Sequence, residues 1–237
     1  MILIACINPS LDKLVQGKKI VLVFNKFALS VQERVQVLAK NFKKANSDYV
    51  CLDSTMSGSG KIIKQKINFL CRDKLEKFKA KGLKTTIRVL VVGVPNSGKS
   101  TLVNNLCGKA KAITGNKPVV TKLNQWVAIG QNNELCDTPG TLYPNLENQE
   151  IAKKLCLIGS IKDQMFDEIE LATDLLSMLE ERYPLENEQR FKRAKGIEEI
   201  AKNRCYLLGK GELDLSRAAN AVIDDFRKGR IGRITLD

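Results

Sequence analysis

The run GVPNSGKS at residues 93–100 constrains this sequence more than any other feature, because it matches the pattern G-x-x-x-x-G-K-[ST] at every fixed position. The apolar segment Ile87–Val92 predicts a strand directly before it, and a helical pattern begins directly after it at Thr101. Glycines let a turn bring successive backbone N–H groups around phosphate oxygens, and the following helix adds the positive end of its dipole. The sequence therefore predicts a phosphate-binding loop for a nucleoside triphosphate.

The side chains of this loop supply further phosphate chemistry. We expect Lys99 to reach the terminal phosphates and the Ser100 hydroxyl to ligate Mg²⁺. The loop residues expected to contact the nucleotide are Asn96, Ser97, Gly98, Lys99, Ser100 and Thr101.

A second phosphate and metal motif is DTPG at residues 137–140, which ends another predicted strand 38 residues after Lys99. In P-loop proteins an aspartate at this place supports the metal, and the glycine N–H senses the γ-phosphate. Thr121, between the two motifs, is expected to close on Mg²⁺ as a switch threonine; the alternative is an ordinary loop threonine. The predicted metal-binding residues are Ser100, Thr121 and Asp137, and the predicted catalytic residues are Lys99, Thr121 and Gly140.

Candidates for reading the base come before the phosphate loop in the chain. Asn25-Lys26 follow one predicted strand, and Asp53-Ser54 follow the next. GTP-specific P-loop proteins read guanine with N-K-x-D and with a short turn after the next strand, and both normally come after the phosphate loop. Parallel sheets bind ligands at the carboxyl ends of their strands, where both candidates stand. We therefore predict that these four residues line the base, in a circularly permuted order of motifs.

Apolar runs alternate with helical patterns up to Pro144, after which only helical patterns continue. The predicted strands are Ile2–Ile7, Lys19–Phe24, Tyr49–Leu52, Ile87–Val92, Trp126–Ile129 and Glu134–Cys136. The predicted helices are Gln32–Lys44, Ile62–Lys81, Glu150–Ser160, Gln164–Glu181, Glu186–Arg204 and Ser216–Lys228. Alternating strands and helices indicate a mostly parallel sheet covered on both faces. We expect an α/β, three-layer P-loop NTPase fold over residues 1–147 and a small α-helical domain over residues 148–237.

The charge of the chain is concentrated in the first of these domains. Lys and Arg number 39 against 26 Asp and Glu, a net charge of +13. Residues 1–147 hold 23 basic and 9 acidic residues, a balance of +14, whereas residues 148–237 hold 16 and 17, a balance of −1. Within the predicted amphipathic helix 62–81, we expect Lys74, Lys77 and Lys81 to face outward and contact RNA phosphates. The alternative is a solvated helix face.

The absence of histidine and the spacing of the cysteines exclude several kinds of active site and metal site. No histidine occurs in the sequence, which excludes a Ser-His-Asp triad, a Cys-His pair, a histidine zinc site and an imidazole base. The seven cysteines form no CxxC pair and are interpreted as reduced thiols. No segment reaches the ~20 apolar residues needed to cross a bilayer. We predict a cytoplasmic protein without a membrane partner, monomeric when free.

In this order and spacing the motifs resemble those of the circularly permuted YlqF-type GTPases over almost all of the chain. Weaker matches are KG at 81–82, QW at 125–126, GSIKD at 159–163, EERYP at 180–184, FR at 226–227 and GR at 232–233. The resemblance implies a GTPase that converts GTP to GDP and phosphate with Mg²⁺. It also implies late assembly of the large ribosomal subunit, with ribosomal RNA contacted partly through the C-terminal domain. Asn96 would help to hold a K⁺ ion beside the phosphates.

The sequence departs from this family at three places. Ala28 stands at the fourth position of N-K-x-D, where a carboxylate accepts two hydrogen bonds from guanine, so guanine binding is expected to weaken by about 2–3 kcal/mol. Thr141 follows the DTPG motif, and its hydroxyl is a poor group for orienting water. The family's helical segment with an aromatic-Pro-Gly-His stretch has no counterpart here, and we expect its role to be lost. Two alternatives therefore stay open: a non-hydrolysing nucleotide-binding RNA scaffold and an NTPase of relaxed base specificity.

Overall fold

The structure is a computed structural model that describes residues 6, 15–108, 125–129, 133–141, 148–192 and 194–236. The described residues up to 141 belong to one compact unit, and those from 148 onward belong to a second. The predicted strand Ile2–Ile7, apart from Cys6, and the predicted switch residue Thr121 lie outside the described residues.

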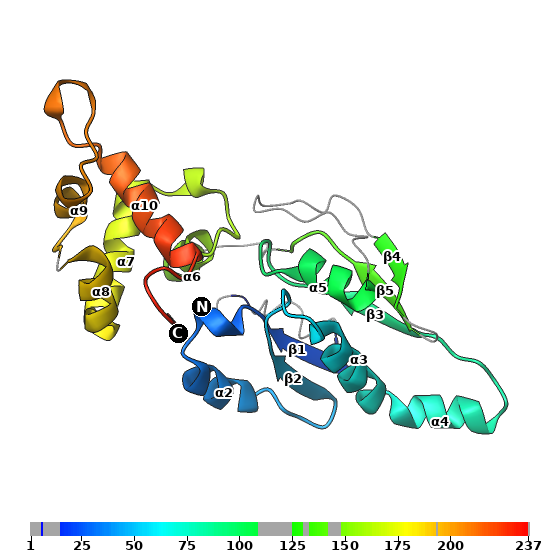
Figure 1. Ribbon diagram of the computed structural model, residues 1–237. Helices are drawn as coiled ribbons and strands as arrows, with labels where there is room; N and C mark the ends of the chain where they lie inside the picture. The colour runs from blue at the N-terminus through cyan, green and yellow to red at the C-terminus, as the bar shows by residue number, and fades with distance from the viewer. Residues whose placement is uncertain are drawn as a thin grey trace. The chain divides into compact units, whose positions relative to one another are not determined.

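The first unit contains a parallel pair of strands, β1 (Ile20–Phe24) and β2 (Ser47–Cys51), connected through α2 (Gln32–Lys40) (Figure 1). The sequence of β1, IVLVF, is rich in the β-branched and aromatic residues that favour strands. Parallel strands need a crossover connection, which α2 supplies. The register places Phe24 opposite Cys51, so the two strands end level with each other.

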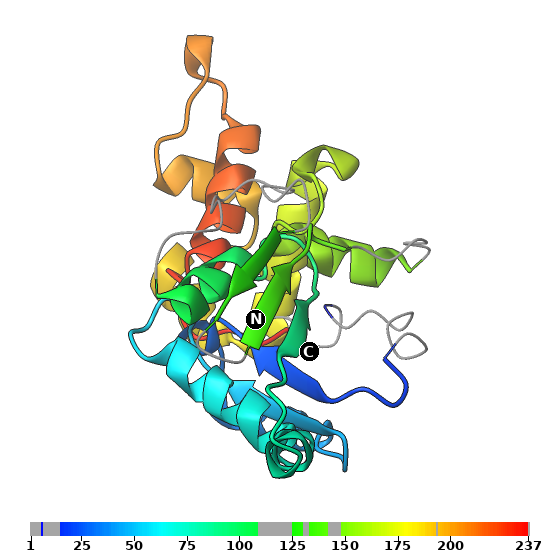
Figure 2. The ribbon, with the colours of Figure 1, turned by 90° about the vertical axis from the view of Figure 1, so that its right-hand side faces the viewer.

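A second sheet has the strand order β3-β5-β4 (Figure 2). Strand β3 (Ile87–Val91) pairs in parallel with β5 (Asn133–Asp137), and β4 (Gln125–Ala128) pairs antiparallel with β5. Val91 lies opposite Asp137, so β3 and β5 also end level. The strand that leads into the phosphate loop and the strand that ends at Asp137, the predicted metal-binding aspartate, are therefore direct neighbours.

One hydrophobic core joins both sheets to α3 (Ser59–Leu70) and α5 (Lys99–Cys107), two helices that pack side by side (Figure 1). Its buried members are Val50, Leu52, Ile63, Ile67, Ile87, Leu102, Val103, Leu106, Ile129 and Leu135. Burying one aliphatic side chain of this size contributes roughly 1.5–3 kcal/mol. The core therefore fixes the strand ends from which the predicted site loops extend.

The expected cover on both sheet faces is wrong for β3. Burial alternates along this strand: Ile87 is buried, whereas Arg88 is exposed and Leu90 is 60% exposed. Strands buried on both faces are near-continuous apolar runs, and a central arginine interrupts that pattern here. The Arg88 guanidinium instead lies 5.7 Å from the ring centre of Trp126 on β4, which is itself exposed.

The predicted helix Ile62–Lys81 is wrong as a single packed element. The structure has two helices there, α3 and α4 (Arg72–Ala80), with Cys71 between them at φ −98° and ψ 7°. No residue of α4 is buried. Its apolar residues, Leu75 and Phe78, are half-buried, and Leu75 packs against the core cluster without entering it, because two apolar residues form only a narrow stripe. The lysines predicted to contact RNA therefore lie on or directly after α4, an exposed basic helix that follows the packed helix α3.

The second unit is helical. Its helices are α6 (Gln149–Leu157), α7 (Glu168–Arg182), α8 (Pro184–Phe191), α9 (Ile197–Asn203) and α10 (Leu215–Arg227), with 3₁₀ turns η3 (Asp163–Met165) and η4 (Gly209–Gly211). The side chains of Asn148, Asp167 and Asp214 cap α6, α7 and α10 by accepting backbone N–H hydrogen bonds. The predicted helix Glu186–Arg204 is divided into α8 and α9, because Lys192 ends α8 in a left-handed conformation.

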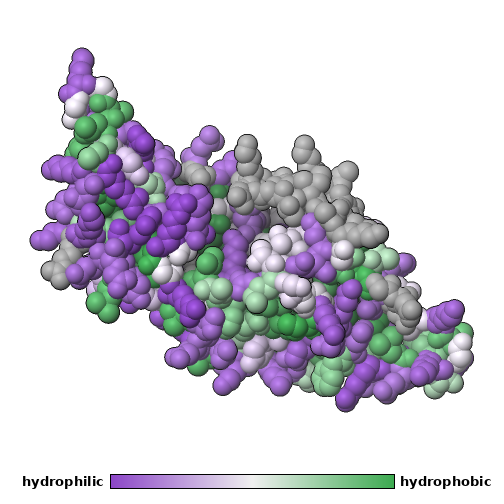
Figure 3. All heavy atoms as spheres, viewed as in Figure 1, coloured by the Kyte–Doolittle hydropathy of each residue, from purple (hydrophilic) through white to green (hydrophobic). Residues whose placement is uncertain are grey.

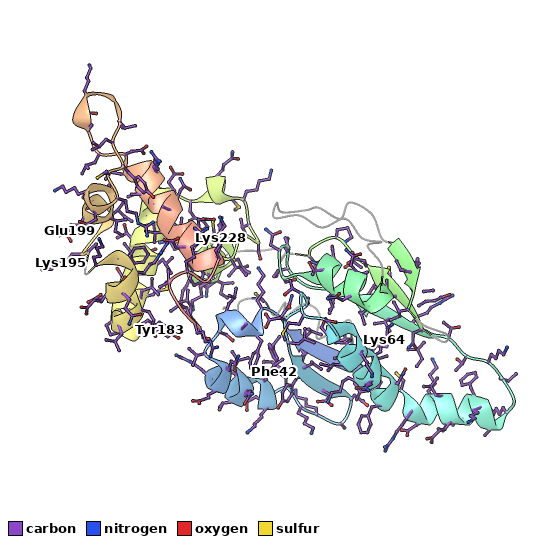
Figure 4. The ribbon with its side chains drawn as sticks, in the orientation of Figure 1. Phe42, Lys64, Tyr183, Lys195, Glu199 and Lys228 are labelled. Atoms are coloured by element: carbon purple, nitrogen blue, oxygen red, sulfur yellow. The ribbon has the colours of Figure 1, made fainter. Side chains whose placement is uncertain are left out.

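Residues 234–236 are buried and complete the interior of the helical unit. Tyr183, which lies between α7 and α8, donates a hydrogen bond to the Thr235 carbonyl oxygen (2.8 Å) and accepts one from the Thr235 N–H (3.0 Å) (Figure 4). Ile234 and Leu236 beside it are buried. Hydrophilic residues cover most of the face of this unit that Figure 3 shows. The apolar residues of α7 and α10 are correspondingly directed inward.

Asp225 on α10 is the centre of a buried ionic network in this unit. Its carboxylate is 2% exposed and lies 2.8 Å from Nη2 of both Arg190 and Arg204, and 3.3 Å from Nη1 of Arg230. Burial alone would raise the pKa of Asp225, but hydrogen bonds from Arg190 and Arg204 hold that pKa below its usual value. A lowered folded-state pKa stabilises the fold above the unfolded pKa, and this contribution is lost as the pH falls through the folded pKa.

We predict that Asp225→Asn lowers the free energy of unfolding at pH 7 by about 3 kcal/mol, because it removes the buried carboxylate that neutralises the half-buried Arg190 and Arg204. Urea unfolding followed by far-UV circular dichroism measures this, and the difference from the parent should shrink below about pH 4. The neighbouring Asp224→Asn is the control: its carboxylate is 43% exposed and pairs with Lys228 and Arg230, so the change should cost at most about 1 kcal/mol. Equal effects of the two substitutions would contradict the prediction.

Candidate nucleotide-binding site

The predicted phosphate loop turns sharply between β3 and α5. Gly93, Asn96 and Gly98 have φ values of 156°, 58° and 91°. Glycine adopts such values without a steric penalty, and asparagine tolerates the left-handed region better than most residues. Within the turn, the Ser97 hydroxyl donates a hydrogen bond to the Val94 carbonyl oxygen at 2.8 Å. The loop thus has the folded-back path that directs backbone N–H groups to one point.

Lys99, the first residue of α5, folds over this loop. Its Nζ donates hydrogen bonds of 2.9 Å each to the carbonyl oxygens of Gly93 and Val94. Burial lowers the pKa of Lys99, and the nearby Asp137 partly offsets that effect. The ammonium group is therefore held at the mouth of the loop, where phosphate oxygens are its natural partners.

Two oxygen ligands suited to a hard cation meet next to Lys99. The Ser100 hydroxyl donates a hydrogen bond to Oδ2 of Asp137 at 3.3 Å. Asp137 is fully buried at the end of β5, and its place results from the level ends of β3 and β5. Hydroxyl and carboxylate oxygens are the donors that Mg²⁺ prefers. The residues present therefore fit the predicted metal.

The DTPG segment approaches the phosphate loop closely. A Cβ atom at Gly140 would lie 2.6 Å from Cγ and 2.8 Å from Cα of Pro95, so only glycine fits there without displacement. The Thr141 N–H donates to the Gly93 carbonyl oxygen at 3.0 Å, and the Thr138 hydroxyl donates to the Val91 carbonyl oxygen at 2.7 Å. The predicted γ-phosphate sensor Gly140 therefore lies in close contact with the phosphate loop.

Asn25 connects the phosphate loop to the predicted base-binding turn. Its Nδ2 donates to the Ser97 carbonyl oxygen at 2.8 Å, and its Oδ1 accepts the Ser54 N–H at 2.8 Å. The sequence separations are 72 and 29 residues. A Cβ at Gly98 would collide with the Asn25 amide, so this glycine also permits the contact. The structure therefore brings the permuted motifs together at one edge.

The remaining predicted base-binding residues lie around Asn25. Lys26 precedes the 3₁₀ turn η2 (Phe27–Leu29) with a left-handed φ of 56° and is exposed. The Asp53 carboxylate accepts the Ala28 N–H at 2.9 Å. Thr101 belongs to the first turn of α5. The predicted RNA-binding residues are Lys74, Lys77 and Lys81, and all three are exposed. They lie on α4 or directly after it, so they belong to a different element from the residues around Asn25.

Sequence reasoning missed a residue that positions the base-binding turn. Asn105 on α5 donates through Nδ2 to the Ser54 carbonyl oxygen and to the Ser59 hydroxyl, the latter at 3.2 Å. A Cβ at Gly60 would lie 2.5 Å from the Asn105 carbonyl oxygen, so α3 and α5 touch closely there. The glycines of the SGSG segment at 57–60 were the available signal, because closely packed helices need small residues at their contact.

One predicted metal ligand lies outside the described residues, and the described residues contain no second cluster of metal ligands. Thr121, predicted to bind the metal, lies outside the described residues. Among the residues that the structure describes, no group of three or more Cys, Asp or Glu side chains is arranged to hold a metal ion. The same residues contain no helix with both the length and the apolar character that crossing a membrane requires.

Comparisons with known proteins agree with this geometry. Residues 88–206 match the family described as 50S ribosome-binding GTPase. Ribosome biogenesis GTPase A of Bacillus cereus is 32% identical over 238 residues, covering 97% of this chain and 80% of that protein. Its counterpart in Thermotoga maritima is 27% identical, covering 93% and 76%. In fold, the chain is similar to the GNP-bound YlqF from T. maritima, with a TM-score of 0.64 and 21% identity over 96% of each chain.

Fold and site together define a P-loop GTP-binding protein whose predicted base-binding residues precede its phosphate loop. The chain belongs to the family of YlqF-type ribosome biogenesis GTPases. The predicted α/β P-loop fold with permuted motifs, followed by helices, is confirmed.

We predict that Lys99→Ala abolishes nucleotide binding without unfolding the protein, because the substitution removes the charge at the loop mouth and leaves the core intact. The nucleotide retained on purification and the affinity for GDP measure the effect, and circular dichroism checks the fold. Lys84→Ala, at an exposed lysine between α4 and β3, is the control and should bind GDP as the parent does. An unchanged GDP affinity of folded Lys99→Ala would refute the assignment.

Proposed function

We propose that the protein hydrolyses GTP to GDP and phosphate at a low intrinsic rate and acts in late assembly of the large ribosomal subunit. In this proposal the nucleotide state controls docking on the subunit. The observation that supports the nucleotide part most directly is the Asn25 side chain, which joins the phosphate loop and the turn at Ser54. Together with the level ends of β3 and β5, it gathers base, phosphate and metal residues at one edge.

Each group at this edge has a separate task in the proposal. The amides of residues 93–101 bind the phosphates, and Lys99 stabilises the charge on the terminal ones. Ser100 and Asp137 would hold Mg²⁺, joined by Thr121, and the ion would neutralise charge on the phosphate oxygens. The Gly140 N–H senses the γ-phosphate. Asn96, on the outer part of the loop, would help to hold K⁺.

The proposal of a low intrinsic rate of hydrolysis rests on the position of Thr141. The backbone N–H of this residue is bonded to Gly93, and its hydroxyl is buried with no hydrogen-bond partner among the described residues. Because this hydroxyl is buried, we expect it not to orient the attacking water molecule. Positioning by a partner is then needed for rapid hydrolysis, as electrostatic catalysis depends on preorganised groups.

We predict that purified large ribosomal subunits accelerate single-turnover GTP hydrolysis at least tenfold, because the subunit supplies the missing positioning. Phosphate release from preloaded protein, with and without subunits, measures the rate. Small subunits serve as the matched control and should have no effect. Binding to large subunits without any acceleration would instead favour the non-hydrolysing scaffold.

RNA contact is proposed for α4. Lys74, Lys77 and Lys81 are spaced by three and four residues, so they share one side of the helical path. All three are exposed, and no residue of α4 is buried. Leu75 packs against the core cluster, so the lysines on the exposed side of α4 can present their ammonium groups to phosphates without loss of packing. The protein is proposed to act in the cytoplasm and to be a monomer when free.

We predict that replacing Lys74, Lys77 and Lys81 together by Ala weakens binding to ribosomal RNA and reduces the slope of log K against log salt by roughly 2, if each lysine contacts one phosphate. Binding titrations at several KCl concentrations give this slope. The control replaces Lys40, Lys43 and Lys44, three exposed lysines at the end of α2, with the same change in net charge. Identical slopes for the two triple variants would assign α4 to solubility alone.

A further inference from the structure

The site as described lacks one group that guanine requires. Guanine presents two neighbouring donors, N1–H and the 2-amino group, which a carboxylate can accept together. Ala28 stands where the family carries that carboxylate, and its methyl group cannot accept a hydrogen bond. A guanine-specific site therefore needs the carboxylate from another residue.

A carboxylate from another loop lies next to the backbone of residue 28. Oδ2 of Asp53 accepts the backbone N–H of Ala28 at 2.9 Å. The contact spans 25 residues of sequence and results from the register of β1 and β2, since Phe24 opposes Cys51 and the following backbone stays paired through Leu52. Asp53 is half-buried, whereas Ser54 next to it is buried, so of these two predicted base-binding residues Asp53 is the one that reaches solvent.

We propose that Asp53 supplies the carboxylate that reads guanine in this protein, in place of the aspartate absent at position 28; this rests on the proposed GTP-binding function. Two carboxylate oxygens offer about four lone-pair sites, so accepting one backbone N–H leaves capacity for both guanine donors. The hydrogen bond from the Ala28 N–H orients the Asp53 carboxylate beside the other predicted base-binding residues. Asn25 fixes the backbone of the same turn through the Ser54 N–H at 2.8 Å.

The competing explanation is that Asp53 only stabilises the η2 turn by accepting the Ala28 N–H. The two explanations differ in their consequence for the base. Xanthine keeps N1–H but has a carbonyl oxygen in place of the 2-amino group, so an amide, with one acceptor and one donor, complements it as a carboxylate complements guanine. An Asp53→Asn change retains an oxygen for Ala28 N–H and alters only the pattern offered to the base.

The test measures affinities of parent and Asp53→Asn protein for GDP and xanthosine diphosphate. The expected result is at least a tenfold loss of GDP affinity with a gain in affinity for xanthosine diphosphate. Adding Ala28→Asp to Asp53→Asn should restore GDP binding, because it returns a carboxylate to the neighbouring position. Asp73→Asn, an exposed aspartate on α4, is the control of equal charge change and should leave both affinities unchanged. An unchanged GDP-to-xanthosine diphosphate ratio in folded Asp53→Asn overturns the proposal.

A second measurement needs no variant. Inosine diphosphate lacks the 2-amino group, so the parent protein should bind it at least tenfold more weakly than GDP. Equal affinities would overturn the role of Asp53, and so would equal affinities for GDP and ADP. In both cases GDP still binds, so the GTP-binding function survives. Failure of the parent to bind any guanine nucleotide, or unimpaired binding by Lys99→Ala, would instead refute the proposed function itself.

Discussion

Two hydrogen bonds of the Asn25 side chain hold together loops that are far apart in the chain. One amide group reaches the carbonyl oxygen of Ser97 in the phosphate loop and the N–H of Ser54 in the base-binding turn. An amide is suited to this because it offers a donor and an acceptor on one planar group. The contact also needs Gly98, since any Cβ there would collide with it. One polar side chain therefore connects the predicted base-binding residues directly to the phosphate loop.

That bridge is possible because of the strand registers beneath it. Phe24 opposes Cys51 in one sheet and Val91 opposes Asp137 in the other, so the two strands of each parallel pair end level with each other. The loops that follow each pair therefore begin at the same edge of their sheet. One core of Leu, Ile and Val side chains packs against both sheets and the helices α3 and α5. Deletion of such a side chain typically costs about 2–5 kcal/mol. Core packing therefore limits how far the loops can move, and the polar contacts only complete an arrangement that apolar burial has prepared.

The sequence allowed much of this site to be predicted, because GVPNSGKS has a fixed spacing and lies between a strand and a helix. Strand bounds follow from apolar runs, and each lies within two residues of the observed strand in the described part of the chain. The break at Cys71 was not predictable from periodicity, since the apolar pattern continues across it. Nor were Asn105 or the contact between Asp53 and Ala28, because both depend on register and helix packing rather than on local pattern.

The permuted order decides which segments are covalently next to the phosphate sensor. In an unpermuted P-loop GTPase, base-reading strands follow the DxxG motif; here they precede it, and the chain passes from Thr141 to α6, which begins at Gln149. Residues 141–148 lie between Gly140, the predicted γ-phosphate sensor, and the first residue of α6. On the other side of the phosphate loop, the permutation places α3 and α4 between β2 and β3. Since α3 packs on α5 while no residue of α4 is buried, the connection that closes the permuted order also supplies an exposed basic helix. The two candidate RNA-contacting parts, α4 and the helical unit, thus lie on either side of the segment that carries the phosphate loop and the DTPG motif.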